Sequence, residues 1–250
     1  MRRLVLLATL VVTIAACGGG GDDADASLTT TTSSDASSTT TTTADPTTTT
    51  APTDCDNVSI PAGATDVSEE LADVDGDGDP DELRSYLVGD ADWHLQVELA
   101  AGGGADLAIT TFGAGAVAVL GGADVDGDGA DEIWARTGSG ASATILGLAR
   151  FAHCALTRVT FTGGDPAEIP VGGSVGTASG LECEAHVDPT ADLTGYTATN
   201  IGDDQYDVSA TEYALEGTTL AQKGTETSIA TAGDDTFARA TTFVCGNLSL

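Results

Sequence analysis

The chain has few basic and few aromatic residues for its length of 250 residues. Eight Lys and Arg stand against 39 Asp and Glu, which gives a formal net charge of −31. A negative field of this size repels nucleic acid, so we exclude nucleic acid as a partner. Aromatic residues make up only 4% of the chain, so the hydrophobic core is expected to be lean.

The chain also lacks the common motifs of redox and catalytic chemistry. It has no Cys-x-x-Cys, and His94, His153 and His186 form no His-x-x-x-His or Glu-x-x-His pair, which argues against a redox-active pair and a zinc site. Residues 172–176 match Gly-x-Ser-x-Gly, but Pro170 precedes them and a Gly/Ser-rich stretch follows. A nucleophile elbow requires a strand before the serine and a helix after it. We therefore predict no catalytic residue and expect a non-enzymatic protein.

The most distinctive feature that is present is an aspartate-rich loop that occurs twice, 51 residues apart. Loop 1 spans residues 73–81 and loop 2 spans residues 124–132. Both have carboxylates at positions 1, 3, 5 and 9, glycines at positions 4 and 6, and at position 7 a residue that usually binds through its backbone carbonyl. The predicted ligands are Asp73, Asp75, Asp77, Asp79, Asp81, Asp124, Asp126, Asp128, Ala130 and Glu132.

These loops predict two calcium sites. Carboxylates about 4–5 Å apart repel one another by roughly 3–4 kcal/mol per pair at an effective dielectric constant near 20. A hard dication removes this repulsion, and a ligand set of oxygen atoms without His or Cys favours Ca²⁺ over zinc or copper. Neither loop is an EF-hand, because position 12 is Arg84 or Ala135 where that motif requires glutamate. The alternative interpretation is a solvated acidic turn with no ion.

The two loops resemble the calcium loops of FG-GAP (VCBS-type) repeats, a family known from the β-propellers of integrin α-subunits. The resemblance is best at loop 2, where residues 112–119 (Phe-Gly-Ala-Gly-Ala-Val-Ala-Val) are similar to the Phe-Gly and Gly-Ala-Pro segments of the repeat. Before loop 1 the chain offers only Pro-Ala-Gly-Ala at residues 61–64. The resemblance covers residues 60–165 and implies that calcium ions hold propeller blades together, without implying a particular activity.

Sequence periodicity predicts an all-β domain over residues 55–250. Residues 93–99 alternate apolar and polar side chains, as a half-buried strand should, and similar apolar runs bounded by Gly, Asp or Ser follow. A period of 51 residues suits a four-stranded propeller blade, and the 196 residues of the domain hold just under four periods. We therefore expect a small β-propeller of about three to four blades, with a β-sandwich or an incomplete propeller as the alternative.

The N-terminus has the features of a bacterial lipoprotein signal. Two arginines precede an apolar run over residues 4–14 that is too short to span a membrane, and residues 1–16 are predicted to be a signal peptide. The run ends in Ala-Ala-Cys and resembles a lipobox, in which Cys17 is lipidated and becomes the mature N-terminus. The Thr-rich remainder of residues 17–54 has almost nothing to bury and is expected to be a disordered tether.

The four other cysteines are Cys55, Cys154, Cys183 and Cys245. An even number in an exported domain predicts two disulfides. Three pairings exist in principle, and the sequence does not choose among them. We favour Cys154–Cys183, which closes the shortest loop, and this leaves Cys55–Cys245 to join the ends of the domain.

Together these features predict a calcium-stabilised lipoprotein on the outer face of a bacterial cell membrane, anchored through Cys17. Its all-β domain is expected to be a non-enzymatic binding or adhesion module. The candidate ligands are a cell-wall polymer, a glycan or a protein. The alternative function is that of an extracellular hydrolase in which calcium is structural.

Overall fold

The computed structural model describes residues 55–113, 115–183 and 192–250. These residues form 17 strands and one short helix, α1 (Asp235–Arg239), so the predicted all-β class is confirmed. The predicted signal peptide, Cys17 and the tether lie outside the described residues. In the part of the chain that the structure describes, no helix has both the length and the apolar character needed to cross a membrane.

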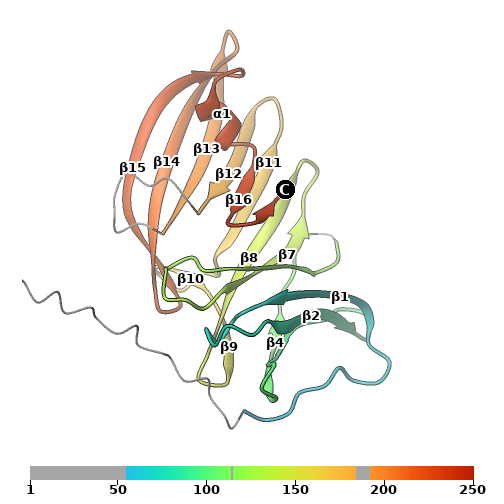
Figure 1. The fold of residues 1–250 in the computed structure, drawn as a ribbon. Helices are drawn as coiled ribbons and strands as arrows, with labels where there is room; N and C mark the ends of the chain where they lie inside the picture. The colour runs from blue at the N-terminus through green and yellow to red at the C-terminus, as the bar shows by residue number, and fades with distance from the viewer. Residues whose placement is uncertain (1–54, 114, 184–191) are drawn as a thin grey trace, which may run out of the picture. The chain divides into compact units, whose positions relative to one another are not determined.

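The strands belong to two sheets (Figure 1). In chain order they are β1 (Thr65–Ala72), β2 (Asp81–Val88), β3 (Asp92–Glu98), β4 (Gly104–Ile109), β5 (Phe112–Gly113), β6 (Ala118–Ala123), β7 (Glu132–Ser139), β8 (Ala143–Ala152), β9 (Ala155–Arg158), β10 (Thr160–Phe161), β11 (Glu168–Gly173), β12 (Thr177–Glu182), β13 (Leu193–Gly202), β14 (Gln205–Glu216), β15 (Thr219–Thr231), β16 (Phe243–Cys245) and β17 (Leu248–Ser249). The first sheet contains β1 to β4, and the second contains the other thirteen strands. Within the described residues, neither sheet closes into a barrel or a propeller.

The second sheet contains a meander that repeats the architecture of the first sheet. β6, β7, β8 and β9 pair antiparallel in that order, as β1, β2, β3 and β4 do. Loop 1 connects β1 to β2, and loop 2 connects β6 to β7. The 51-residue repeat of the sequence is therefore also a structural repeat, with each acidic loop between the first two strands of a four-stranded unit.

The two meanders contact each other where β1 and β2 meet β6 and the residue before it, and where β4 meets β9. The Oγ atoms of Ser68 in β1 and Ser85 in β2 lie 2.7 Å apart. Ser68 accepts a hydrogen bond from the Val119 backbone N–H at 3.0 Å, and Ser85 donates one to the Val117 carbonyl at 3.1 Å. The buried apolar residues shared by the two meanders include Leu83, Leu95, Val97, Ile109, Val117, Val119, Ile133 and Phe151.

The C-terminal half departs from the predicted repeat. β12 to β15 pair antiparallel in chain order, and β13, β14 and β15 are 10, 12 and 13 residues long. The short helix α1 contacts β12, β14 and β15. A four-stranded unit with an acidic loop therefore occurs twice in the described residues, against the three to four units expected from chain length.

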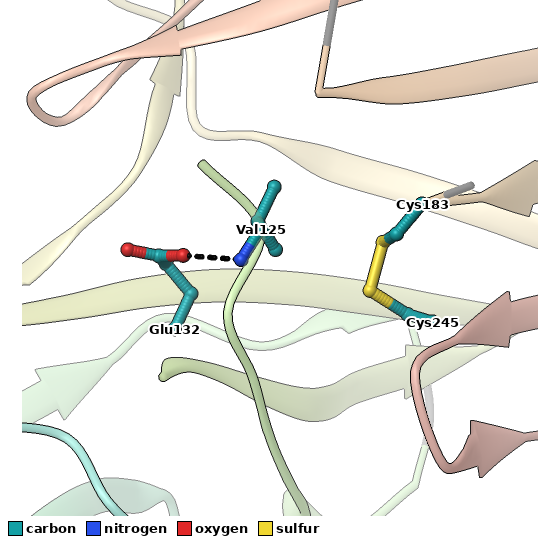
Figure 2. The surroundings of a disulfide bond; sticks show 4 residues. All are labelled: Val125, Glu132, Cys183 and Cys245. Carbon is teal, nitrogen blue, oxygen red and sulfur yellow. Dashed lines mark hydrogen bonds between the residues drawn. A yellow bond between two sulfur atoms is a disulfide. The ribbon is translucent and has the colours of Figure 1, made fainter. Parts of the chain in front are cut away.

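Two disulfides are present, as predicted, but the favoured pairing is wrong. The structure joins Cys55 to Cys154, and Cys183 to Cys245 (Figure 2 shows the second). β12 pairs in parallel with β16, and this pairing places Cys183 beside Cys245. Strand pairing, and not the length of the closed loop, therefore decides the connectivity. Two disulfides indicate an extracytoplasmic location, because the cytosol keeps thiols reduced.

Candidate metal centre

The carboxylate of Asp73 organises loop 1. Its Oδ1 accepts hydrogen bonds from the backbone N–H groups of Gly76 at 2.9 Å and Asp77 at 3.1 Å, and its Oδ2 accepts one from Gly78 at 2.9 Å. Gly76 and Gly78 have φ angles of +72° and +93°, in the left-handed region that favours glycine. The first predicted ligand therefore also fixes the backbone of the loop.

Three carboxylates of loop 1 converge. Asp73, Asp75 and Asp81 offer oxygen atoms that lie within 4.8 Å of one another. Asp81 is 1% exposed, and its two oxygens accept hydrogen bonds from the backbone N–H groups of Val74 at 3.0 Å and Ala100 at 2.9 Å. Asp75 is 7% exposed, and its Oδ2 has no hydrogen-bond partner among the described residues. A buried carboxylate oxygen without a partner is costly, and a bound cation would remove this cost.

The charge of this triad is not offset by any basic residue in the part of the chain that the structure describes. Among the described residues, the carboxylates of loop 1 form no ion pair, and Arg84, the basic residue nearest in sequence, pairs with three glutamates outside the loop. Burial, assisted by the charges of Asp81 and Asp77, raises the pKa of Asp75 to about 6. Burial also raises the pKa of Asp81, although two backbone hydrogen bonds oppose the shift. Both shifts reflect negative charge that is buried without a counter-charge.

Loop 2 has the same backbone hydrogen bonds as loop 1. Asp124 accepts them from the N–H groups of Gly127 at 2.8 Å, Asp128 at 3.1 Å and Gly129 at 3.1 Å. Gly127 and Gly129 have φ angles of +74° and +95°, close to those in loop 1. Asp124, Asp126 and Asp128 offer oxygen atoms within 4.8 Å of one another, and this triad is more exposed than the triad of loop 1.

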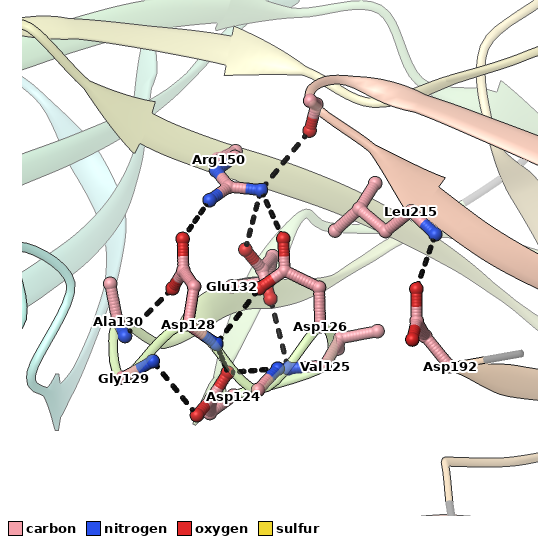
Figure 3. A network of polar contacts seen from close by, with 12 residues as sticks. Asp124, Val125, Asp126, Asp128, Gly129, Ala130, Glu132, Arg150, Asp192 and Leu215 are labelled. Carbon is pink, nitrogen blue, oxygen red and sulfur yellow. Dashed lines mark hydrogen bonds and ion pairs between the residues drawn. The ribbon is translucent and has the colours of Figure 1, made fainter. Parts of the chain in front are cut away.

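Loop 2 differs from loop 1 because an arginine lies over its carboxylates (Figure 3). Arg150 Nη1 lies 2.5 Å from Asp126 Oδ2 and 3.6 Å from Glu132 Oε1, and Nη2 donates to Asp128. Glu132 is 1% exposed; its Oε2 accepts the Val125 N–H at 2.9 Å, whereas its Oε1 has no hydrogen-bond partner among the described residues. Burial raises the pKa of Glu132 to about 8, and the charge of Arg150 reduces this shift.

Six of the ten predicted ligands form the two triads, and the other four lie around them. Glu132 lies beside the triad of loop 2, under Arg150. Asp77 and Asp79 are exposed, and Asp77 Oδ1 accepts the Asp79 N–H at 2.8 Å. Ala130, expected to contribute its carbonyl, donates its N–H to Asp128 at 3.0 Å.

Asp131 joins the two loops, a role that the sequence did not predict. Its backbone N–H donates to the Asp73 carbonyl at 2.7 Å, and its Oδ2 accepts the Asp73 N–H at 3.2 Å. Burial raises the pKa of Asp131, although hydrogen bonds from the backbones of Asp73 and Asp124 oppose the shift. A Cβ at Gly122 would lie 2.4 Å from the Ala72 Cβ, so only glycine lets the strands that lead into the loops approach this closely.

The roles of Asp131 and Arg150 could hardly be predicted from the sequence. Asp131 is not among the predicted ligands, and its counterpart in the 51-residue repeat is Pro80. Arg150 follows loop 2 by 18 positions and reaches it only because β7 and β8 pair antiparallel. The only indication in the sequence was that Asp131 and Arg150 are charged, whereas the residues 51 positions earlier, Pro80 and Leu99, are not.

A second polar cluster lies outside the loops. His94 Nδ1 is 2.7 Å from Asp106 Oδ1, and the Tyr86 hydroxyl donates to Asp106 Oδ2 at 2.5 Å. The rings of Tyr86 and His94 stack, with centroids 5.0 Å apart. Burial raises the pKa of Tyr86, which keeps the phenol protonated as a donor. Ser174 lies in the turn between β11 and β12, so a strand stands where a nucleophile elbow requires a helix.

Comparisons with protein-family models, with curated proteins and with solved structures find no match to this chain. The chemistry of the loops therefore rests on their own geometry. That geometry consists of two carboxylate triads, both capable of holding a metal ion, on two matching four-stranded units.

Proposed function

We propose that both loops bind Ca²⁺ and that the protein is a calcium-stabilised, non-enzymatic binding module of the bacterial cell surface. The observation that carries this proposal is the Oδ2 atom of Asp75, a buried carboxylate oxygen for which the described residues supply no donor, in a triad with Asp73 and Asp81. A bound dication would supply the missing partner and offset two of the three negative charges. The all-oxygen ligand set favours Ca²⁺ over zinc and copper.

The two four-stranded units are, in this proposal, FG-GAP-type repeats that form an incomplete propeller. Support comes from the equivalent position of the two loops, each of which connects the first and second strands of its unit. The hydrogen bonds between Asp131 and Asp73 connect the two loops, so ions bound in the loops would stabilise the packing of one unit on the next. Calcium would then act on the stability of the pair and not on a chemical reaction.

The N-terminal cysteine is proposed to anchor the protein to the outer face of the cell membrane. The lipobox-like Ala-Ala-Cys sequence and the two disulfides of the exported domain support this location. Several acyl chains on Cys17, at about 0.8 kcal/mol per buried CH₂, would anchor the chain durably. Replacing Cys17 with Ala is expected to move the protein from the membrane fraction to the culture medium in the cells that produce it. Equal membrane association of Cys17→Ala and the unaltered protein would argue against a lipid anchor.

The proposed partner is a cell-wall polymer, a glycan or a protein, bound by the all-β domain. The alternative is an extracellular hydrolase with structural calcium, and the His94–Asp106 hydrogen bond is the observation that favours it. A panel of glycan and phosphoester substrates would separate the two functions. Hydrolysis that is lost in His94→Ala would support the enzyme, whereas retention of cell-wall material without turnover would support the binding module.

Adding calcium to the protein in EGTA is expected to raise its melting temperature. For dissociation constants of ~10⁻⁴–10⁻³ M, a free calcium concentration of about 2 mM stabilises the fold by roughly 0.5–2 kcal/mol per site. For a domain of this size, this corresponds to a rise of about 1–8 °C per site. Differential scanning calorimetry at increasing free calcium would measure the shift.

Two matched variants control this experiment. Asp75→Asn keeps the size of the side chain but removes a charge from the triad of loop 1, so its response to calcium should be reduced. Asp207→Asn removes an exposed carboxylate from β14, away from both loops, and should respond as the unaltered protein does. A melting temperature that is independent of calcium in the unaltered protein would refute the calcium sites.

A further inference from the structure

The two loops are followed by equivalent strands that carry different residues. Over the half of the strands next to the loops, the register of β2 with β3 is repeated, 51 residues later, by the register of β7 with β8. After Arg136 a bulge shifts the pairing of β7 with β8 by one residue. In this shared register, Leu99 of the first unit corresponds to Arg150 of the second. Leu99 is 3% exposed and belongs to the apolar core, whereas the side chain of Arg150 extends over loop 2 (Figure 3).

The guanidinium of Arg150 already contacts the carboxylates that an ion at loop 2 would need. It pairs with Asp126, Asp128 and Glu132. The Arg150 side chain is only 16% exposed and those of Asp126 and Glu132 are 14% and 1% exposed, so solvent screens these two pairs weakly, whereas Asp128 is 43% exposed. Loop 1 contains a more buried triad with no ion pair among the described residues. A dication that enters loop 1 therefore meets uncompensated carboxylates, and one that enters loop 2 meets a positive charge first.

We infer that Arg150 is an internal counter-cation of loop 2, and that loop 1 binds Ca²⁺ first while loop 2 binds it only when Arg150 is displaced. This inference rests on the proposed function and adds an order of filling to it. Charge repulsion between a guanidinium and a dication that share the same carboxylates is the physical cause. Arg150 thus sets the affinity of loop 2 without being one of its ligands.

Displacement of Arg150 would also affect the β14–β15 hairpin, which is far from loop 2 along the chain. Arg150 Nη1 donates a hydrogen bond to the carbonyl of Gly217 at 3.3 Å, and Gly217 lies in the turn between β14 and β15. The same guanidinium therefore connects loop 2 to the C-terminal strands. Filling of loop 2 would release this contact, whereas filling of loop 1 would leave it intact.

Calcium titration of the intact chain by isothermal titration calorimetry tests the inference, with the metal alone as ligand. The unaltered protein should bind one ion tightly and a second at least about tenfold more weakly. Arg150→Leu, which introduces the residue of the matching position in the first unit, should strengthen the second step about tenfold or more. Arg150→Gln, which removes the charge but keeps a polar side chain, should act in the same direction and serves if Arg150→Leu does not fold.

Further variants assign the steps to the loops. Asp75→Asn should abolish the tight step and leave the weak one, and Asp75→Asn with Arg150→Gln should bind one ion at the strengthened affinity. Arg158→Gln is the control, because Arg158 pairs with Glu168 outside both loops, and its titration should match that of the unaltered protein. Equal affinities in the unaltered protein, or a second step that is unchanged or weaker in both Arg150 variants, would overturn the inference and leave calcium binding intact. Absence of any calcium binding would instead refute the proposed function, and the inference with it.

Discussion

Replacing Asp81 with Ala is expected to lower the free energy of unfolding in EGTA by about 2–4 kcal/mol, although the residue was predicted only as a metal ligand. Asp81 is 1% exposed, and its carboxylate accepts hydrogen bonds from the backbone N–H groups of Val74 and Ala100. Each buried N–H left without an acceptor costs roughly 1–3 kcal/mol. Loss of a buried carboxylate whose pKa is raised offsets part of this cost. Urea denaturation in EGTA, followed by circular dichroism, would measure the change.

Asp81→Asn separates the structural role of this residue from its role as a ligand. The amide retains one carbonyl oxygen, which can accept one of the two hydrogen bonds, so the expected loss in EGTA is about half as large, roughly 1–2 kcal/mol. The negative charge is lost, so the stabilisation by calcium at loop 1 should disappear in Asp81→Asn as well as in Asp81→Ala. If Asp81→Asn kept the full calcium response, Asp81 would be a structural residue and not a ligand.

Trp134→Ala is expected to cost about 3–5 kcal/mol, the largest effect of any single substitution considered for this domain. Trp134 lies in β7, is fully buried, and packs against Phe243 of β16 with ring centroids 5.1 Å apart. Aromatic residues are scarce in this chain, so few neighbouring side chains can fill the resulting cavity. Urea denaturation of the unaltered protein and Trp134→Ala would give the difference in unfolding free energy.

Trp134→Phe is the matched variant for this position. It keeps an aromatic ring against Phe243 and removes the indole Nε1, which has no hydrogen-bond partner among the described residues. Its expected cost is therefore only about 1–2 kcal/mol. A cost below about 1 kcal/mol for Trp134→Ala would show that the packing of Trp134 against Phe243 contributes little to stability.

The prediction for residues 93–99 was correct for the strand, but it did not anticipate which polar side chains are buried. β3 spans Asp92–Glu98, as the alternation indicated. However, Gln96, on the face expected to be exposed, is 1% exposed. Arg84 of the neighbouring strand β2 donates to its Oε1 at 3.4 Å, in a group with Glu98. Alternation identifies a strand, but it does not show that a neighbouring strand carries a long side chain that covers the polar face.

The disulfides and the number of repeats show the same limit. The sequence predicted two bridges, because four cysteines remained after Cys17, but the favoured partners were wrong. Dividing the length of the domain by 51 suggested three to four units, whereas β13, β14 and β15 form longer strands, and no further loop with the pattern of loops 1 and 2 occurs among the described residues. Both predictions used distance along the chain, and strand pairing makes this distance a poor guide to distance in space.

The sequence by itself determined the all-β class and the local geometry of the two acidic loops. This was possible because the interactions that shape each loop are local. In each loop, the first aspartate (Asp73 or Asp124), the glycines with positive φ and the N–H groups that donate to the aspartate all lie within six consecutive residues. Only the tertiary structure decided that the loops adjoin through Asp131 and that Arg150 pairs with three carboxylates of loop 2. These contacts join residues from 18 to 58 positions apart, and they form only after strand register and the packing of two units have brought those residues together.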